Sequence, residues 1–317
     1  MESLRDKSRR GTLISTLDRT RTSMGGRKLR HWILHPLLDV EPIRARLEGV
    51  DALFGDTGLR LRLAEVLKGV ADLERLLGRL TSRTGNARDV KGLGESLARV
   101  PDIRSAIAEC GAPMLRAIFE GMDELRDVAQ VIADAIVDEP PIPLNEGRII
   151  KDGCDAELDR IRDLVRGGRD WIASLQRQEI ERTGIPNLKV GYNKVFGYYI
   201  EVSKAHTAKV PETYQRKQTL VNAERYITPE LKSREEEIVN AQERMNDLEY
   251  ALFCGLRDDI CRQAGRIQAT ADAVATLDAL LSLADTAAAR NYCKPALDDS
   301  DRIHIRDGRH PVVEDLM

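Results

Sequence analysis

The apolar stripe that follows residue 228 limits what this chain can fold into more than any other feature. Its apolar residues recur at intervals of seven and of three to four up to about Arg290, a spacing that predicts a long helix with one apolar face. The segment Thr228-Pro229-Glu230 predicts the helix start, because it offers a hydroxyl cap, a proline in the first turn and an acid near the positive end of the helix dipole. If unbroken, about 60 residues at about 1.5 Å each would span roughly 90 Å. The seven-residue repeat consists of Leu231, Ile238, Met245 and Leu252.

A second helix of similar character precedes this stripe. Residues Asp155 to Thr183 show helical periodicity, and Gly184-Ile185-Pro186 predicts the end of that helix. Two long helices that run in opposite directions are expected to pack along their apolar stripes. Residues 12 to 137 predict a bundle of shorter helices, and the proline-rich stretch 138–144 predicts a linker between the two regions.

Between the two long helices the periodicity changes from helical to alternating. Residues Leu188 to Ser203 predict a β-hairpin with its turn around residues 193–197. A second β-prone stretch, Tyr214 to Ile227, predicts a partner for that hairpin. So small a sheet would need support from the flanking helices to be stable.

These elements predict a mainly α fold. We expect a helical bundle with two long antiparallel helices that carry a small antiparallel β insert. Composition agrees, because charged residues make up 32% of the chain and aromatic residues only 4%, as is typical of long solvent-exposed helices.

The β insert differs in charge from the rest of the chain. The formal net charge of the whole chain is -3, so any nucleic-acid partner must be met by a local basic patch. The insert has a balance of +4, and such bases suit contacts with phosphates, which give affinity without sequence reading. The bases could equally make an exposed sheet edge soluble. The bases are Lys189, Lys194, Lys204, Lys209, Arg216, Lys217 and Arg225, and the acids are Glu201, Glu212 and Glu224.

Aromatic side chains are also concentrated in the insert. Stacking on nucleic-acid bases is one role for them, but the strand alternation favours a small hydrophobic core and cross-strand pairs. The aromatic residues are Tyr192, Phe196, Tyr198, Tyr199, Tyr214 and Tyr226.

No motif for catalysis, metal binding or nucleotide binding is visible in the sequence. The five cysteines are scattered without a C-x-x-C pair, the five histidines show no ligand spacing, and no G-x-x-x-x-G-K-[ST] phosphate loop occurs. We also find no signal peptide and no run of 18 apolar residues, which disfavours secretion and membrane spanning. A reducing cytoplasm fits this pattern.

Three blocks of sequence resemble the bacterial MutS family of DNA mismatch repair proteins. The first, Leu17-Asp18-Arg19-Thr20-Arg21-Thr22-Ser23-Met24-Gly25-Gly26-Arg27, is similar to the opening of that family's core or lever domain. The second pairs Gly191-Tyr192-Asn193-Lys194-Val195-Phe196-Gly197-Tyr198-Tyr199-Ile200 with residues 218–226, and is similar to the family's clamp domain. The third, Gly308-Arg309-His310-Pro311-Val312-Val313-Glu314, resembles the beginning of its ATPase domain.

The resemblance implies a domain plan. It assigns residues 1–168 to the first part of the core or lever domain, 169–230 to the clamp, 231–292 to the returning lever helices and 293–317 to the beginning of a truncated ATPase domain. It also implies that the clamp touches the DNA backbone without sequence preference. The residues at DNA-facing positions of the clamp would be Asn193, Lys194, Asn222, Lys189, Arg216 and Lys217.

The chain also departs from the family pattern. It lacks the mismatch-reading Phe-x-Glu motif and ends without a phosphate loop, so we expect a middle fragment that is not itself an enzyme and binds no cofactor. ATP and Mg²⁺ would belong to the absent ATPase domain. The implied partners are mismatched double-stranded DNA, a second copy in a full-length homodimer and other repair proteins such as MutL, in the cytoplasm or at the nucleoid and without a membrane.

A different class of function stays open on the residues alone. The chain could be a structural coiled-coil scaffold whose basic tip binds a protein partner. Salt-dependent binding to a DNA duplex would separate the two hypotheses, because phosphate contacts weaken steeply as salt rises.

Overall fold

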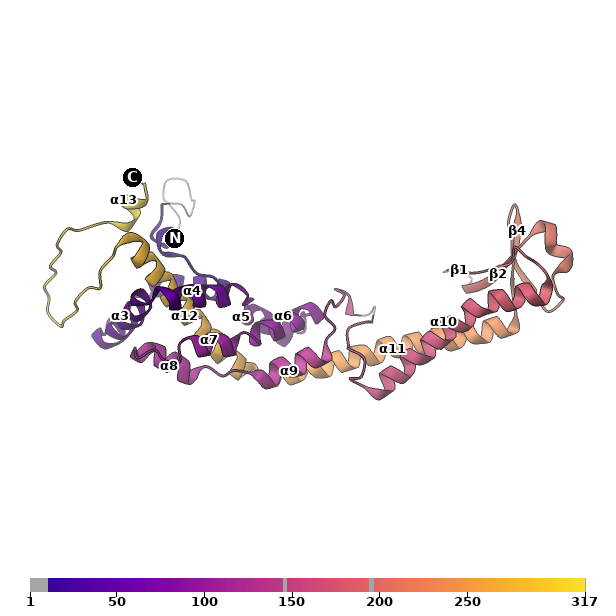
Figure 1. The fold of residues 1–317 in the computed structure, drawn as a ribbon, viewed down its shortest axis with the longest axis horizontal. Coiled ribbons are helices and arrows are strands. Elements are labelled where there is room, and N and C mark those ends of the chain that lie inside the picture. The colour runs from indigo at the N-terminus through magenta and orange to yellow at the C-terminus, as the bar shows by residue number, and fades with distance from the viewer. Residues whose placement is uncertain (1–10, 145–146, 194–196, 317) are drawn as a thin grey trace. The chain divides into compact units, whose positions relative to one another are not determined.

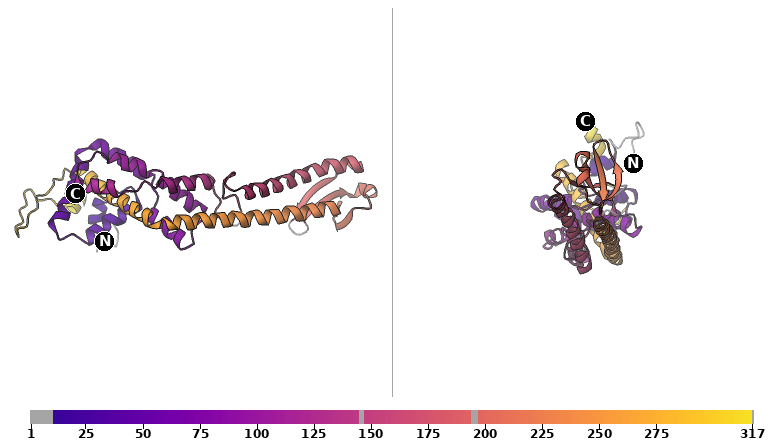
Figure 2. Two further views of the ribbon diagram at one scale, coloured as in Figure 1. Left: turned by 90° about the horizontal axis from the view of Figure 1, so that it is seen from below. Right: turned by 90° about the vertical axis from the view of Figure 1, so that its right-hand side faces the viewer.

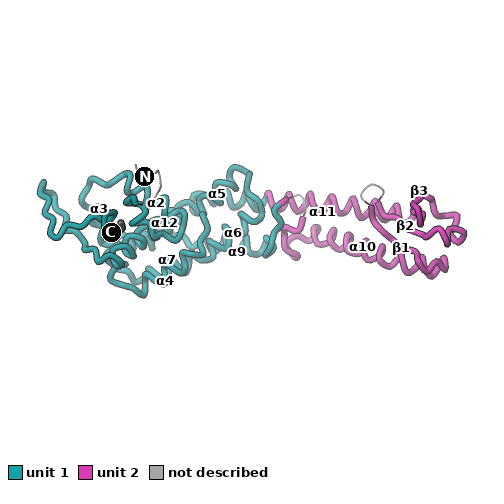
Figure 3. The backbone as a smooth tube through the Cα atoms, turned by 90° about the horizontal axis from the view of Figure 1, so that it is seen from above, with its two compact units in different colours: residues 1–142, 255–317 teal, residues 143–254 magenta. Residues whose placement is uncertain are grey.

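The chain forms two compact units in the computed structural model, which describes residues 11–144, 147–193 and 197–316. Unit 1 comprises Met1–Ile142 and Gly255–Met317, and unit 2 comprises Pro143–Cys254 (Figure 3). Unit 2 is therefore one continuous segment, and it is inserted in sequence between the two segments of unit 1. Helices dominate both units, and the one sheet of the described residues lies in unit 2, which confirms the mainly α fold with a small β insert (Figure 1).

Unit 1 is a bundle of helices, as the sequence predicts for residues 12–137. Most of its first-segment helices begin at a Thr, Asp or Asn cap, which satisfies backbone N–H groups that the helix leaves free. Its helices are α1 (Leu13–Leu17), α2 (Ser23–Leu34), α3 (Val40–Gly55), α4 (Thr57–Lys68), α5 (Leu73–Thr81), α6 (Ala87–Leu97), α7 (Val100–Ala106), α8 (Pro113–Gly121), α9 (Arg126–Ala135), α12 (Ala264–Arg290) and α13 (Pro311–Leu316).

Helix α12 is the centre of the unit 1 core. It packs against α2, α3, α4, α5 and α8, and most of its side chains from Ala271 to Ala284 are buried. By length and composition α12 could cross a membrane, but 72% of its most apolar window is buried inside the protein, as in the core helix of a soluble domain. It is therefore weak evidence for membrane spanning.

A buried carboxylate of α12 fixes the start of α2. Asp278, which is fully buried, accepts hydrogen bonds from the backbone N–H of Arg21 at 2.9 Å, the backbone N–H of Thr22 at 2.8 Å and the hydroxyl of Thr22 at 2.7 Å. Burial raises the pKa of the Asp278 carboxyl, while these donors oppose the rise. A Cβ atom at Gly25 would overlap the Asp278 side chain, so only glycine fits there. The motif around residues 17–27 thus joins the two segments of unit 1.

The long helices of unit 2 are α10 (Ala156–Thr183) and α11 (Pro229–Arg262). Asp155 caps α10 by accepting from the N–H of Leu158 at 2.8 Å, and Gly184 ends it in a left-handed conformation. Thr228 caps α11, as predicted, by accepting from the N–H of Leu231 at 3.1 Å. Helix α11 begins in unit 2 and its last residues belong to unit 1.

The apolar stripe that follows residue 228 forms two consecutive helices and not one unbroken helix. Helix α11 ends at Arg262 and α12 begins at Ala264. At Gln263 the backbone leaves helical geometry, and its N–H bonds to the carbonyl of Ile260 three residues back instead of four. The apolar stripe continues through this break, so periodicity alone did not reveal it.

Within unit 2, α10 and α11 lie side by side and run in opposite directions (Figures 1 and 2). Arg169 donates to the side chain of Gln242 at 3.1 Å, and Arg244 pairs with Glu157 at 3.3 Å. Gly168 lies inside the continuous helix and leaves room for Ile238 of α11. The antiparallel pairing predicted from the two apolar stripes is confirmed.

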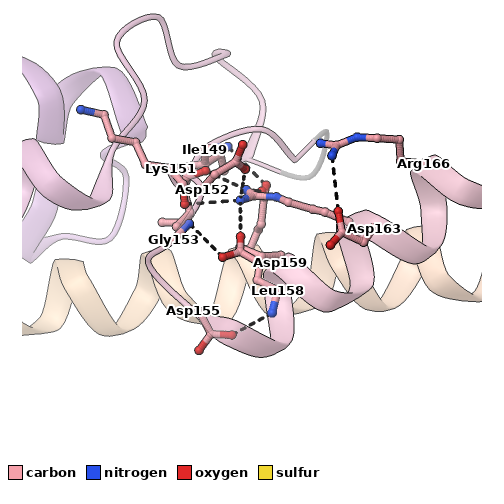
Figure 4. A network of polar contacts seen from close by, with 12 residues as sticks. Ile149, Lys151, Asp152, Gly153, Asp155, Leu158, Asp159, Asp163 and Arg166 are labelled. Carbon is pink, nitrogen blue, oxygen red and sulfur yellow. Dashed lines mark hydrogen bonds and ion pairs between the residues drawn. The ribbon is translucent and has the colours of Figure 1, made fainter.

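A polar network joins α10 and α11 at the end of the helix pair where α10 begins. The loop at residues 149–153 lies beside the first turns of α10 (Figure 4). Arg162 of α10 donates to the carbonyl of Ile150 and to the carboxylate of Asp152, each at 2.7 Å, and it also pairs with the buried carboxylate of Glu249 on α11. Glu249 in turn accepts from the N–H of Ile149 at 3.2 Å. One arginine thereby holds a loop and two helices together.

Four strands form the antiparallel sheet of unit 2, in the order β1-β2-β4-β3. They are β1 (Lys189–Asn193), β2 (Gly197–Ser203), β3 (Gln215–Thr219) and β4 (Ala223–Ile227). A short 3₁₀ helix, η2 (Lys204–Lys209), follows β2. Both predicted β stretches are confirmed. The edge strands are β1 and β3, and a bulge interrupts the pairing of β3 between Arg216 and Gln218.

Candidate nucleic-acid interface

One face of the sheet packs against α10 and α11 and holds the insert in place. Ile200 and Val202 of β2 are fully buried with Ile172 of α10 and Leu231 and Ile238 of α11. Residues 200 and 202 share a face because successive strand side chains alternate. The small sheet thus obtains its hydrophobic support from the two long helices.

Three of the aromatic residues of the insert belong to this core or pack against it. Tyr214 and Tyr226 are buried with ring centroids 5.9 Å apart, and Tyr198 packs against the same cluster. The interpretation of core and cross-strand pairs is therefore confirmed for these three. Tyr192 forms a cross-strand pair with Tyr198, with ring centroids 4.9 Å apart, but is 56% exposed, and Tyr199 lies on the opposite face beside Arg225. Phe196 lies outside the described residues.

Two tyrosine hydroxyls of the insert donate hydrogen bonds to carboxylates. Tyr214 donates to Glu179 of α10 at 2.5 Å, and Arg182 pairs with the same carboxylate at 2.7 Å. Tyr226 donates to Glu224 at 2.5 Å. Burial, followed by the hydrogen bond to Glu224, raises the pKa of the Tyr226 hydroxyl to about 12. These tyrosines are neutral hydrogen-bond donors at physiological pH.

The opposite face of the sheet is polar, and its arginine is already paired. Arg225 of β4 donates to Glu201 of β2 at 2.9 Å and to Gln218 of β3 at 3.0 Å. Its guanidinium also lies 4.1 Å from the ring centre of Tyr199. The charge of Arg225 is therefore compensated within the sheet, although the sequence counted it among the bases of the insert.

The structure places the predicted site residues at both ends and on both edges of the sheet. Asn193 ends β1, half-buried and opposite Gly197, whereas Asn222 is exposed in the turn between β3 and β4. Asn193 lies opposite Gly197, the first residue of β2, whereas Asn222 precedes Ala223, which pairs with Ser203, the last residue of β2. The two asparagines are therefore separated by about the length of this strand, roughly 20 Å. They do not form one compact site.

The predicted bases lie on the two edge strands. Lys189 begins β1 and Lys217 occupies the bulge of β3, and both are exposed. Arg216 is also exposed but lies 3.5 Å from the carboxylate of Glu224, so its charge is partly compensated. Lys194 lies outside the described residues. Exposure on sheet edges is what both a phosphate contact and a soluble edge require.

Two lysines that were not among the predicted site residues lie in η2, and the backbone of one of them contacts Asn222. Lys204 and Lys209 begin and end η2, which contacts β2 and β4, and both side chains are exposed. The backbone N–H of Lys204 donates to the carbonyl of Asn222 at 3.1 Å. Their presence in the basic count was the only sequence signal, because the folding of η2 back onto the sheet is not visible in a linear pattern.

The described residues contain no group of three or more His, Cys, Asp or Glu side chains that could hold a metal ion. The features that remain are a sheet with free lysines on its edges and at one end, and two long helices that carry it. Fold and surface together define a class: a helical scaffold that presents a small, basic-edged sheet.

Comparison with known proteins places the chain within a family of that class. The family model for MutS domain III matches residues 1–284. The chain is 49% identical over 313 residues to the DNA mismatch repair protein MutS of Pelotomaculum thermopropionicum, covering 98% of this chain and 36% of that protein. It is 45% identical to MutS of Clostridium kluyveri over 318 residues and 48% identical to MutS of Symbiobacterium thermophilum over 315 residues, again covering 36% of each relative.

This chain belongs to the MutS family of DNA mismatch repair proteins. It spans about a third of the length of the curated relatives that it matches. The resemblance identified on three sequence blocks is therefore confirmed over nearly the whole chain.

Proposed function

We propose that unit 2 acts as a clamp that holds a DNA duplex by its phosphate backbone, without reading the base sequence, during mismatch repair. The observation that carries the proposal is a set of exposed lysines on a small sheet and on the adjoining 3₁₀ helix η2, in a chain of net negative charge. Among the residues that the structure describes, no carboxylate pairs with any of them. The set is Lys189, Lys204, Lys209 and Lys217.

Free lysines suit this role for a physical reason. An unpaired ammonium group gains affinity by releasing counterions from DNA phosphates, whereas a paired arginine such as Arg225 would first have to break its contact with Glu201. Lysine acts as a flexible point charge and does not select a base edge. Binding independent of sequence follows from this chemistry.

The two long helices give the clamp a mechanical role in the same proposal. Helices α10 and α11 would act as levers that pass the nucleotide state of an ATPase domain to the sheet. That ATPase domain, with its ATP and Mg²⁺, the homodimer and contacts with proteins such as MutL belong to the full-length family member. This chain itself is proposed to hydrolyse no ATP, and an ATPase assay on the purified chain tests this.

Salt dependence of duplex binding tests the DNA grip. We expect weak binding to a duplex of any sequence at about 50 mM salt, with affinity that falls steeply toward 200 mM. Lys217→Ala and Lys194→Ala should each reduce the slope of log affinity against log salt by about one. Lys68→Ala, which removes an exposed lysine of unit 1, is the matched control and should leave the slope unchanged. Equal slopes for all four proteins would contradict the proposal.

One observation favours the alternative, a scaffold whose tip binds a protein. Val221, in the turn between β3 and β4, is 86% exposed, and an apolar side chain at a loop tip is suited to a protein contact. That function predicts binding which is insensitive to salt and is lost in Val221→Asp. Retained duplex binding by Val221→Ala with an unchanged salt slope would favour the clamp.

A further inference from the structure

The β1–β2 hairpin is joined to each long helix by one hydrogen bond, which runs from a strand N–H to a helix side chain. The N–H of Tyr198 donates to the Glu235 carboxylate of α11 at 3.0 Å. The N–H of Val190 donates to the Gln176 side-chain carbonyl of α10, also at 3.0 Å. Both acceptors are side chains, so two residues outside the sheet add polar contacts to the hydrophobic packing that holds the hairpin.

Glycine at position 197 brings the hairpin directly against Glu235. Gly197 has a φ of +76°, and a Cβ atom there would overlap the Glu235 carboxylate. Asn193 pairs with Gly197 in the sheet register, so Glu235 supports the residue directly opposite a predicted DNA contact. Any displacement of Glu235 would therefore move this end of the sheet.

The two tie points differ in charge. Gln176 is neutral, whereas Glu235 carries a carboxylate that no described cation neutralises. The neighbouring bases on α11 are engaged elsewhere, since Arg234 pairs with Glu237 at 2.8 Å and Lys232 with Glu236 at 3.9 Å. An amide at position 235 could accept the same hydrogen bond, so the negative charge is not needed for positioning.

We propose that Glu235 is a positioning residue for the beginning of β2, at Gly197 and Tyr198, and that its charge also limits how tightly this end of the sheet holds nucleic-acid phosphates. The inference rests on the proposed DNA grip. Glu235 holds the hairpin through an accepted hydrogen bond and repels phosphates through a separate, long-range electrostatic effect. A clamp that must release its duplex gains a faster dissociation from such a charge.

Substitutions at the two tie points separate these effects. Glu235→Gln keeps the acceptor and removes the charge, so the chain should bind a duplex about twofold more tightly at about 50 mM salt. The gain should shrink toward 200 mM salt, because exposed charges are screened more strongly there. Gln176→Glu is the mirror image on α10: it keeps the acceptor, adds a charge and should weaken binding about twofold.

The hydrogen bond is isolated by comparing two neutral variants. Glu235→Ala should bind about fivefold more weakly than Glu235→Gln, because the Tyr198 N–H loses its acceptor. Hydrogen exchange of the Tyr198 amide should be about tenfold faster in Glu235→Ala than in Glu235→Gln. Gln176→Ala should likewise speed the hydrogen exchange of the Val190 amide, and it does so without changing the charge of either helix.

The outcomes distinguish this inference from the proposed function. Equal affinities of Glu235→Gln and the unsubstituted chain at both salt concentrations would overturn the electrostatic part, and equal amide exchange in the Ala and Gln variants would overturn the positioning part. An unsubstituted chain that binds no duplex at low salt would contradict the DNA grip and with it the electrostatic part. The exchange comparison would still decide the positioning role.

Discussion

A single glycine in α2 sets how closely that helix approaches α12. The Asp278 side chain fills the space in which a Cβ of residue 25 would stand, whereas a Cβ at the next glycine, Gly26, would have the Thr20 hydroxyl as its nearest neighbour at 3.2 Å. The two adjacent glycines of the motif are therefore not equivalent. Only the first is required for close packing.

Gly25→Ala should consequently destabilise the protein, and Gly26→Ala should not. The methyl group at position 25 must displace a buried carboxylate that accepts three hydrogen bonds, at a cost of about 3 kcal/mol. At position 26 the higher helix propensity of alanine offsets the small displacement of Thr20, leaving a change within about 1 kcal/mol. Urea denaturation followed by circular dichroism measures both, and equal midpoints for the two variants would contradict the packing argument.

Residue identity alone could not show which charges of the insert are free. The alternating pattern correctly predicted that tyrosines such as Tyr226 form the core, because alternation is a local property of a strand. The partner of Arg225 is Glu201, which lies on a neighbouring strand and becomes adjacent only through the sheet register. Charge counting therefore included a base that the fold neutralises.

The helices were predictable where their signals are local. The helix expected from Asp155 to Thr183 is α10 almost residue for residue, because its cap at Asp155 and its stop at Gly184 lie in the adjacent sequence. The break at Gln263 was not predictable. The apolar stripe is continuous there, and the long-range contacts that α12 makes with the other helices of unit 1 are not visible in a local pattern.

At the level of elements, one arginine, Arg162, links α10 to α11 and to the loop at residues 149–153. Arg162 is 14% exposed and its partner Glu249 only 1%. Arg162→Met should destabilise unit 2 by about 3–4 kcal/mol, because it leaves the carboxylate of Glu249 buried without its cation and the carbonyl of Ile150 without its donor. Hydrogen exchange of the amides at residues 149–153, together with urea denaturation, measures the loss.

The same helix provides a matched control for that substitution. Arg166 lies one turn further along α10, is 68% exposed and pairs with the exposed Asp163. Arg166→Met should change stability by no more than about 0.5 kcal/mol. Adding Glu249→Leu to Arg162→Met should recover part of the loss, since the uncompensated charge is then removed. A double variant less stable than Arg162→Met would show that the charge is not the source of the cost.

At the scale of the whole molecule, unit 2 should fold on its own. It is one continuous segment, residues 143–254, with its own hydrophobic core between the sheet and the helices and its own polar network at the other end. Expressed alone, it should unfold cooperatively in urea and bind a duplex with the same salt slope as the complete chain. A non-cooperative transition, with the complete chain cooperative, would show that the core of unit 1 is needed to stabilise it.

The two-segment construction of unit 1 has a consequence for synthesis on the ribosome. The backbone N–H groups of Arg21 and Thr22 have no acceptor at Asp278 until that residue is synthesised, more than 250 residues later. At about 10 residues per second that interval is roughly 25 s, during which the helices before residue 142 lack α12 to cover their apolar faces. Unit 2, whose contacts are complete by residue 254, can fold within that interval. Unit 2 would then be finished before unit 1, and the unfinished bundle of unit 1 is where a nascent chain would need protection from aggregation.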